Sequence, residues 1–261
     1  MIVNCDDLGV SHAANLATFR SMTLGIATSA TLMVPCPWAF EAARMLAGFS
    51  IGVHLTLTSE YTGYRWRGLT RGAALHDRDG FLPATAKAAL DRLGVDDVRA
   101  ECRAQIDAAL SWGVDVTHLD SHMNIVQDRS DLFEVYLDLA AEYRVPVRMF
   151  SRETTERQGF QAPERAAARG ILCNDHMIYP WPRATGDVLF EEAPKLAPGV
   201  TEIFAHPVLD GEELRGYGPG YADLRAHEAR CLVDASVSEL LDRHGIHRIG
   251  FRDLRALQRG D

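Results

Sequence analysis

Short apolar runs that alternate with segments of helical spacing make up most of the chain. The first three residues are hydrophobic and predict a strand that is buried from its start. Further strands are predicted at residues 28–34, 50–57, about 115–119, 146–150, 171–173, 200–205 and 248–251. Helices are predicted between these strands. The first helix ends near residue 24, and the others lie at 38–47, 96–112, 130–143, 163–169, 187–197 and 221–244.

This regular alternation predicts the fold class. Strand and helix units that follow one another imply a parallel sheet covered by helices. Seven or eight such units without a linker favour one domain over residues 1–261, a (β/α) barrel that is complete, distorted or seven-stranded. A doubly wound open sheet is the alternative. A nucleotide-binding version is not expected, because neither GxGxxG nor a P-loop follows any predicted strand.

Composition and charge narrow the class of partner. The 261 residues are 47% hydrophobic and 24% charged, as in an ordinary globular protein. The net charge of −9 argues against nucleic acid and anionic membranes, which attract a basic face. No apolar run approaches the ~20 residues of a membrane span, and no basic leader is evident, so a cytoplasmic location is expected. Five scattered cysteines without a CxxC pair predict neither a disulfide framework nor a thiolate zinc site.

Acids and histidines stand where several predicted strands end. The carboxyl ends of barrel strands converge on one mouth, where active sites are built. One aspartate with two histidines is a usual ligand set for a catalytic divalent metal ion. Taken singly, the acids could cap a turn and each histidine could be a core residue. The side chains concerned are Asp6 and Asp7, His54, His118 with Asp120 and His122, and His206.

The segment HLDSH is the most informative of these. In an extended chain His118, Asp120 and His122 have the same parity and point the same way. A carboxylate that holds the second nitrogen of a histidine is a common way to orient a metal ligand. The alternative is a polar turn after a strand.

Four motifs in this order give the chain a family resemblance. NCDDLG, GVHLTL, THLDSH and AHP, with GFRDL near the end, resemble the YdjC-like (ChbG/HpnK-type) carbohydrate deacetylases. The resemblance covers most of the chain. It implies a distorted (β/α) barrel related to polysaccharide deacetylases, and removal of acetyl groups from N-acetylated sugars.

The resemblance also implies roles for single residues. It implies that Asp7, His54 and His122 bind the metal, that Asp6 is the general base and that His206 is the general acid. His118 and Asp120 match the motif but are expected to support the ligands. Where familiar members continue with further histidines, this chain has Met123 and Asn124, which predicts a different pocket. Zinc suits the ligand set, whereas magnesium prefers oxygen ligands but is associated with the family.

Other residues are candidates for substrate contact. The long irregular stretch at 58–85 carries Tyr61 and Trp66, whose rings could face a sugar or pin the loop. Arg148 and Asp210 could orient the catalytic groups or form ordinary ion pairs. The acid–histidine pair Asp175–His176 matches none of the motifs.

The expected partner is therefore a small N-acetylated carbohydrate, and the chain could also form a homo-oligomer. One competing hypothesis is another metal-dependent hydrolase that cleaves a different amide or an ester. Another is a non-catalytic metal- or sugar-binding protein. The presence of both proton-transfer candidates, Asp6 and His206, argues against the latter.

Overall fold

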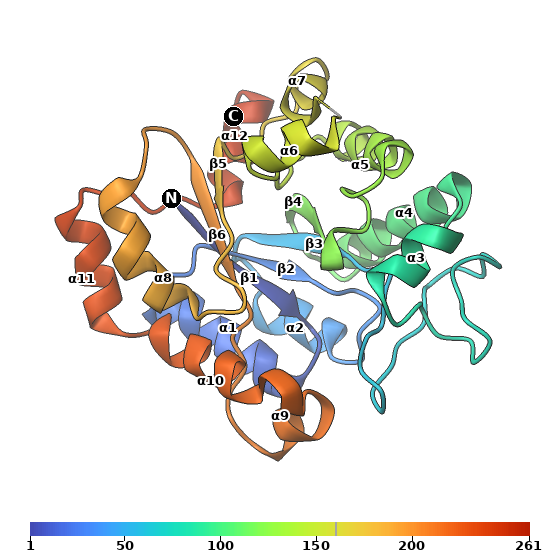
Figure 1. The fold of residues 1–261 in the computed structure, drawn as a ribbon, viewed down its shortest axis with the longest axis horizontal. Coiled ribbons are helices and arrows are strands. Elements are labelled where there is room, and N and C mark those ends of the chain that lie inside the picture. Colours follow the sequence, from blue (N-terminus) through green and yellow to red (C-terminus); the bar gives the residue numbers. More distant parts are fainter. Residues whose placement is uncertain (160) are drawn as a thin grey trace.

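The chain folds around one parallel sheet that is covered by helices (Figure 1). The computed structural model describes residues 1–159 and 161–261. Six strands lie in the order β4-β3-β2-β1-β6-β5, and all neighbouring strands are parallel. They are β1 (Ile2–Leu8), β2 (Ser29–Leu32), β3 (Ile51–Leu55), β4 (Val116–Ser121), β5 (His176–Ile178) and β6 (Thr201–Ala205).

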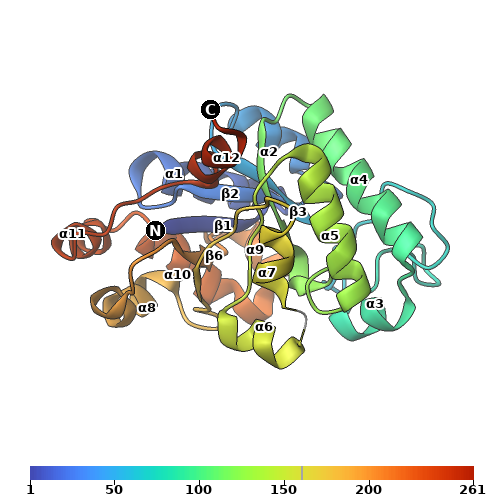
Figure 2. The same ribbon diagram turned by 90° about the horizontal axis from the view of Figure 1, so that it is seen from above.

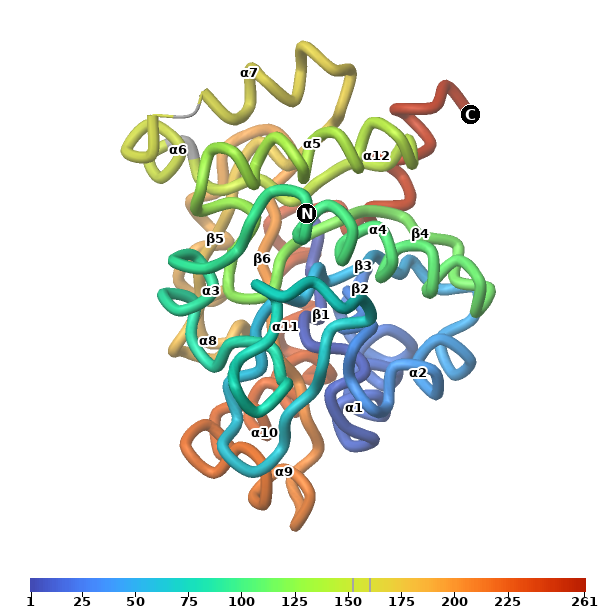
Figure 3. Tube along the Cα trace, turned by 90° about the vertical axis from the view of Figure 1, so that its right-hand side faces the viewer, coloured from blue at the N-terminus to red at the C-terminus, as the bar shows by residue number. Residues whose placement is uncertain are grey.

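Helices surround the sheet, as the three views show from different sides (Figures 1, 2 and 3). Strands β1 to β4 are buried on both faces, which is the expected result of covering a parallel sheet with helices. The α-helices are α1 (His12–Leu24), α2 (Ala39–Met45), α3 (Ala86–Arg92), α4 (Val95–Ser111), α5 (Ser130–Tyr143), α6 (Arg152–Gln158), α7 (Ala162–Ala167), α8 (Thr185–Glu192), α9 (Glu212–Tyr217), α10 (Ala222–Cys231), α11 (Ala235–Arg243) and α12 (Phe251–Arg259).

The parallel α/β class is confirmed, but a seven-stranded barrel is not. The sheet is curled and has six strands, and the strand predicted at 146–150 is reduced to isolated bridges in the described chain. Val147 forms a parallel bridge with Leu119 of β4 and another with Cys173, before β5. Pro146 carries no N–H and cannot donate a bond to the ladder, which explains in part why regular pairing stops there.

Three further predictions are wrong in detail. The strand predicted at 171–173 is reduced to a bridge at Cys173, and β5 lies at His176–Ile178 instead. The strand predicted at 248–251 does not form, and α12 begins at Phe251 instead. The helix predicted at 221–244 is divided into α10 and α11, because Asp234 accepts a bond from the Ser236 N–H and so caps a new helix. The irregular stretch at 58–85 is confirmed, since α3 starts only at Ala86. No helix in the described residues is long and apolar enough to cross a membrane.

The two ends of the sheet are built differently. At the amino ends of the strands, Phe251 of α12 stacks on the ring of His118, with 3.8 Å between centroids. The Ile249 N–H also donates to the Met1 carbonyl at 2.9 Å, so the carboxyl-terminal segment covers this end. The carboxyl ends of the strands are left to form a pocket.

Candidate metal centre and active site

A pocket of about 720 Å³ lies at the carboxyl ends of β1, β3, β4 and β6. Strand β1 brings the two acids there, and a left-handed Asp7 (φ +60°) followed by Gly9 (φ +94°) turns the chain toward α1. A left-handed aspartate is a strained feature of the kind that gathers at functional sites. The residues around the pocket are Asp6, Asp7, His54, Glu60, Tyr61, Thr62, Ser121, His122, Met123, Asn124, Arg148, Phe150, Met177, Tyr179, Trp181, Phe204, His206, Tyr217, Gly218, Pro219, Gly220, Tyr221 and Arg225.

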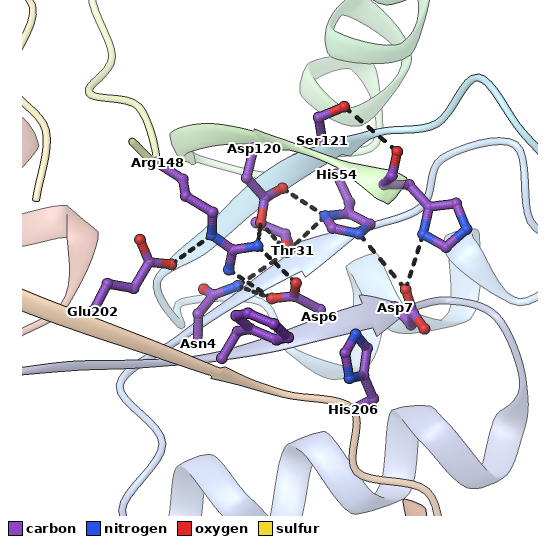
Figure 4. A network of polar contacts seen from close by, with 12 residues as sticks. Asn4, Asp6, Asp7, Thr31, His54, Asp120, Ser121, Arg148, Glu202 and His206 are labelled. Atoms are coloured by element: carbon purple, nitrogen blue, oxygen red, sulfur yellow. Dashed lines mark hydrogen bonds and ion pairs between the residues drawn. The ribbon is translucent and has the colours of Figure 1, made fainter. Parts of the chain in front are cut away.

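The Asp7 carboxylate faces two imidazole rings (Figure 4). Its Oδ1 lies 3.6 Å from His54 Nε2 and 3.2 Å from His122 Nδ1. This oxygen is buried and has no hydrogen-bond partner among the described residues. Its other oxygen accepts a hydrogen bond from Arg225 at 2.8 Å. A buried acceptor without a donor is costly, so Oδ1 is poised for a further ligand.

A second carboxylate holds each of the two rings. His54 Nδ1 lies 2.6 Å from Asp120 Oδ1, and His122 Nε2 lies 3.1 Å from Glu60 Oε2. Metal-ligating histidines are commonly oriented in this way, with the second nitrogen fixed by a carboxylate. The arrangement leaves His54 Nε2 and His122 Nδ1 directed at Asp7.

These residues fit a divalent cation. The candidate ligand atoms of Asp7, His54 and His122 all lie within 4.8 Å of one another. Carboxyl groups outnumber guanidinium groups around these residues, so the cluster has an excess of negative charge that a cation would offset. The carboxyl groups are Asp6, Asp7, Glu60, Asp120 and Glu202, and the guanidinium groups are Arg148 and Arg225.

The pKa of His122 also indicates that a cation is favoured at this position. Burial disfavours its imidazolium form, but the charges of Glu60 and Asp7 outweigh burial and raise its pKa to about 10. Burial likewise opposes ionisation of Asp7, while Arg225 and the neighbouring histidines hold its pKa well below the usual value. The cluster therefore attracts positive charge at this point, and a cation would take the place of the His122 proton.

Asp6 has a different environment from its neighbour. Both of its oxygens are bound by Arg148, at 2.7 Å to Nη1 and 2.7 Å to Nη2, and Asn4 donates to it as well. Burial alone would raise the pKa of Asp6, but Arg148 lowers it to about 2, so the side chain is ionised. Arg148 also contacts Asp120 and Glu202, at 3.0 and 2.8 Å.

Arg148 also decides whether a second cluster could hold a metal. Asp6, His54 and Asp120 have ligand atoms close enough to surround an ion. The guanidinium group of Arg148 already occupies the position between the two carboxylates. Of these two groups, the Asp7 cluster is therefore the better candidate for a cation.

His206 follows β6 and lies on the other side of Asp7 (Figure 4). Burial lowers the pKa of its imidazole to about 4, so the ring is neutral at neutral pH in the free protein. Its Nδ1 is buried and lies 3.9 Å from Glu228, whose other contacts are the His206 N–H and the Thr185 hydroxyl. Burial raises the pKa of Glu228 to about 7.

Four other predicted site residues are divided between the pocket and the rest of the fold. Tyr61 lines the pocket. Trp66 is 3% exposed, and its indole N–H donates to the Thr58 carbonyl at 2.7 Å, so it anchors the loop. Asp210 pairs at the surface with Arg215 at 2.9 Å, away from the described pocket lining. His118 stacks on Phe251 at the opposite end of the sheet.

The pair Asp175–His176 also lies outside the described lining of the pocket. Asp175 accepts a hydrogen bond from the Val200 N–H at 2.7 Å. His176 Nε2 lies 3.2 Å from the Pro198 carbonyl and is exposed. These contacts join β5 to the segment before β6, which makes the pair part of the scaffold.

Three functional residues were missed in the sequence. Arg225 and Glu228 lie three positions apart on α10 and reach Asp7 and His206, while Glu60 follows β3 and holds His122. Their i, i+3 spacing was visible inside a predicted helix, but charged pairs at that spacing usually lie on a solvated face. Nothing in the local pattern around Glu60 marked it as a partner of His122.

Known proteins are similar to large parts of the chain. A carbohydrate deacetylase of Thermus thermophilus is 41% identical over 145 residues, which are 56% of this chain and 51% of the relative. A carbohydrate deacetylase of Thermoanaerobacter pseudethanolicus is 28% identical over 246 residues, which are 92% of this chain and 93% of the relative. A solved structure from Enterococcus faecalis, whose name refers to cellobiose-phosphate cleavage, has a TM-score of 0.84 at 25% identity and covers 97% of both chains. The family model for YdjC-like proteins matches residues 1–243, and the chain belongs to this family.

Proposed function

We propose that the protein is a metal-dependent hydrolase that removes the acetyl group from an N-acetylated carbohydrate. The observation that carries the proposal is the unpartnered Oδ1 of Asp7, which faces two imidazole nitrogens held in place by carboxylates. The names of the relatives, carbohydrate deacetylases, support the substrate class.

The ligand set explains why an ion is useful for this reaction. Asp7, His54 and His122 would hold a divalent cation and leave positions open for other groups. Such a cation supplies Lewis acidity, which polarises a carbonyl group and acidifies water at neutral pH. Zinc fits two imidazoles and one carboxylate better than magnesium does. Arg225 keeps the second Asp7 oxygen occupied, so Asp7 presents a single oxygen to the ion.

Asp6 is the proposed general base. It lines the pocket beside Asp7 and is ionised, so it can accept the proton of the attacking water. The contact with Arg148 fixes the direction of its carboxylate but weakens its basicity. A cation held by Asp7, His54 and His122 would acidify the water and so make proton transfer to Asp6 more favourable. Asp6 is therefore expected to act as a base only when the metal site is occupied.

His206 is the proposed general acid for the departing amine. In the free protein its ring is neutral at neutral pH, because burial disfavours the charged form. Negative charge that develops on the oxygen of the tetrahedral intermediate favours the imidazolium, so His206 would take up a proton from solvent at this stage. Glu228, at 3.9 Å from Nδ1, would stabilise that charge. The proton then passes from His206 to the amine nitrogen as the C–N bond breaks.

The aromatic lining of the pocket suits a sugar ring. Aromatic side chains stand around it, and their faces can pack against the apolar face of a pyranose. Met123 and Asn124, both left-handed, take the positions where histidines were expected from the resemblance and line the same pocket. The aromatic residues are Tyr61, Phe150, Tyr179, Trp181, Phe204, Tyr217 and Tyr221.

Acetate release tests the proposal. Metal-stripped protein is assayed on N-acetylated mono-, di- and oligosaccharides, with each of several divalent metals added back. We expect acetate only with metal, and we expect His206→Ala to depress turnover without emptying the metal site. Acetate release that is unaffected by chelation would refute the metal requirement. Cleavage of O-acetyl esters but no N-acetyl sugar would favour the esterase alternative.

A further inference from the structure

A second group of metal-ligating side chains lies between helices α8 and α10, outside the pocket. Asp187 is on α8, and His227 and Cys231 are on α10. Residues four apart lie on one face of a helix, so His227 and Cys231 project together toward α8. The two helices lie beside each other in the ribbon (Figure 1), and Thr185 of α8 donates to Glu228 of α10 at 3.0 Å.

The separations from His227 to its two neighbours are close to those of ligands around one metal ion. His227 Nε2 lies 3.1 Å from Asp187 Oδ2 and 3.5 Å from Cys231 Sγ. All three ligand atoms are within 4.8 Å of one another. A zinc ion with bonds of about 2.0 Å to nitrogen and 2.3 Å to sulfur separates such ligands by roughly 3.4–3.6 Å. An ion therefore fits with only small side-chain shifts.

The surroundings suit an ion that keeps one position open. Cys231 is buried, whereas the side chains of His227 and Asp187 are 42% and 53% exposed. A cation would have protein on one side and solvent for a fourth ligand on the other. The burial of Cys231 also argues against the nucleophile of a Cys-His-Asp triad. A Cβ placed on Gly186 would lie 2.5 Å from the Cys231 Cβ, so the thiol is packed against α8.

We propose that Asp187, His227 and Cys231 form a second cation site, selective for soft divalent ions of the zinc class. Its cysteine, which would lose its proton when an ion binds, distinguishes it from the pocket, whose candidate ligands are imidazole and carboxylate. An ion there would join α8 to α10, and α10 also carries Arg225 and Glu228. Occupancy would thus stabilise the helix that supports Asp7 and His206.

Cobalt absorption tests the site directly. The whole protein is stripped with a chelator and titrated with Co²⁺, and the thiolate-to-cobalt charge-transfer band in the near ultraviolet is recorded. Of the three candidate groups in the described residues, only this one contains a cysteine, so the band reports on it alone. We expect the band in the wild type and in Asp7→Asn, and its loss in Cys231→Ser and His227→Gln.

Cys173→Ser is the matched control, because Cys173 is the one cysteine of the five that is not buried and is therefore the most open to adventitious Co²⁺. This variant should keep the full band. A band that survives Cys231→Ser, or that disappears with Cys173→Ser or Asp7→Asn, would overturn the assignment, as would absence of any band in the wild type.

Stability gives a second readout that does not depend on activity. In the Asp7→Asn background, added Zn²⁺ should raise the midpoint of thermal unfolding, because an ion that binds only the folded state stabilises it. The additional change Cys231→Ser should abolish most of that rise. An equal rise with and without Cys231 would contradict the proposal.

Discussion

Asp6 and Asp7 are neighbours in the sequence and both are buried, yet the structure surrounds them differently. Each is paired with an arginine, Asp6 with Arg148 and Asp7 with Arg225. Arg148 binds both oxygens of Asp6, whereas Arg225 binds one oxygen of Asp7. The remaining Asp7 oxygen faces two histidines and has no hydrogen-bond partner in the described residues.

Under the proposed function, this difference lets one β-strand serve two chemical tasks. A carboxylate held on both oxygens is fixed in direction and stays ionised, as a proton acceptor requires. A carboxylate with one unmatched oxygen beside two imidazole nitrogens is suited to a cation. Since side chains alternate along a strand, the left-handed turn at Asp7 is needed to bring both acids to the same pocket.

The largest effect is expected from Asp7→Asn. The change removes the charge of a ligand, so metal affinity and acetate release should both fall far more than the roughly 10–100-fold expected for an outer partner of a ligand. Isothermal titration with Zn²⁺ and an acetate assay would measure the two losses. A variant with wild-type affinity would show that Asp7 is not a ligand.

Asp6→Asn should separate chemistry from binding. We expect kcat to fall by about 10²–10⁴-fold, the usual contribution of a general base, while the metal stays bound. Asparagine has nearly the shape of aspartate and can still contact Arg148, which makes it a conservative replacement. Retention of wild-type kcat at saturating metal would remove Asp6 from the role of base.

The carboxylates behind the two histidines should have smaller effects. Glu60→Gln and Asp120→Asn remove the charge that orients His122 and His54, and each should cost about 10–100-fold in metal affinity. Competition with a chelating dye would measure the change. Equal affinity in both variants and the wild type would show that the rings are held by packing alone.

Glu228 predicts a pH dependence of folding. Its pKa is raised by burial from 4.5 to about 7, so the folded protein binds its proton more tightly than the unfolded chain does. This contribution to stability is present below about pH 4.5 and is lost as the pH rises to about 7, a change of about 3 kcal/mol. In metal-free protein, Glu228→Gln should flatten urea-unfolding stability across that range. An unchanged slope would contradict the shift.

Asp210→Asn should have the smallest effect of all. Asp210 is exposed and pairs with Arg215, and solvent and salt screen an exposed ion pair so that it contributes little to stability. Acetate release and metal affinity should match the wild type, so this variant is also the control for the others. A clear loss of turnover would place Asp210 in the active site after all.

The sequence was sufficient to predict the strand-end residues and the class of fold. The short apolar runs gave the positions of β1, β3, β4 and β6, and parallel strands bring their carboxyl ends to one edge. The structure brings Asp7, His54 and His122 together at that edge. The alternation of side chains along a strand predicted that Asp120 and His118 point to the same face of the sheet. Asp120 contacts the proposed ligand His54, whereas His118 stacks on Phe251.

The rest depends on contacts between distant parts of the chain. Arg225 reaches Asp7 across more than two hundred residues, and such a pairing leaves no local signal. Trp66 looked like a sugar platform because the sequence does not show that its indole N–H is bound inside the loop. The number of strand and helix units predicted a barrel. The sequence pattern did not show that Val147, after Pro146, would form only isolated bridges, because that depends on backbone geometry.

Metal stoichiometry tests the division between the two aspartates most directly. Equilibrium dialysis with Zn²⁺ would be run on Asp6→Asn and Asp7→Asn, each in a Cys231→Ser background so that only the pocket is counted. We predict close to one ion per chain for Asp6→Asn and none bound tightly by Asp7→Asn. Equal binding by the two variants, or tight binding by Asp7→Asn alone, would contradict the assignment of Asp7 to the metal and Asp6 to the proton.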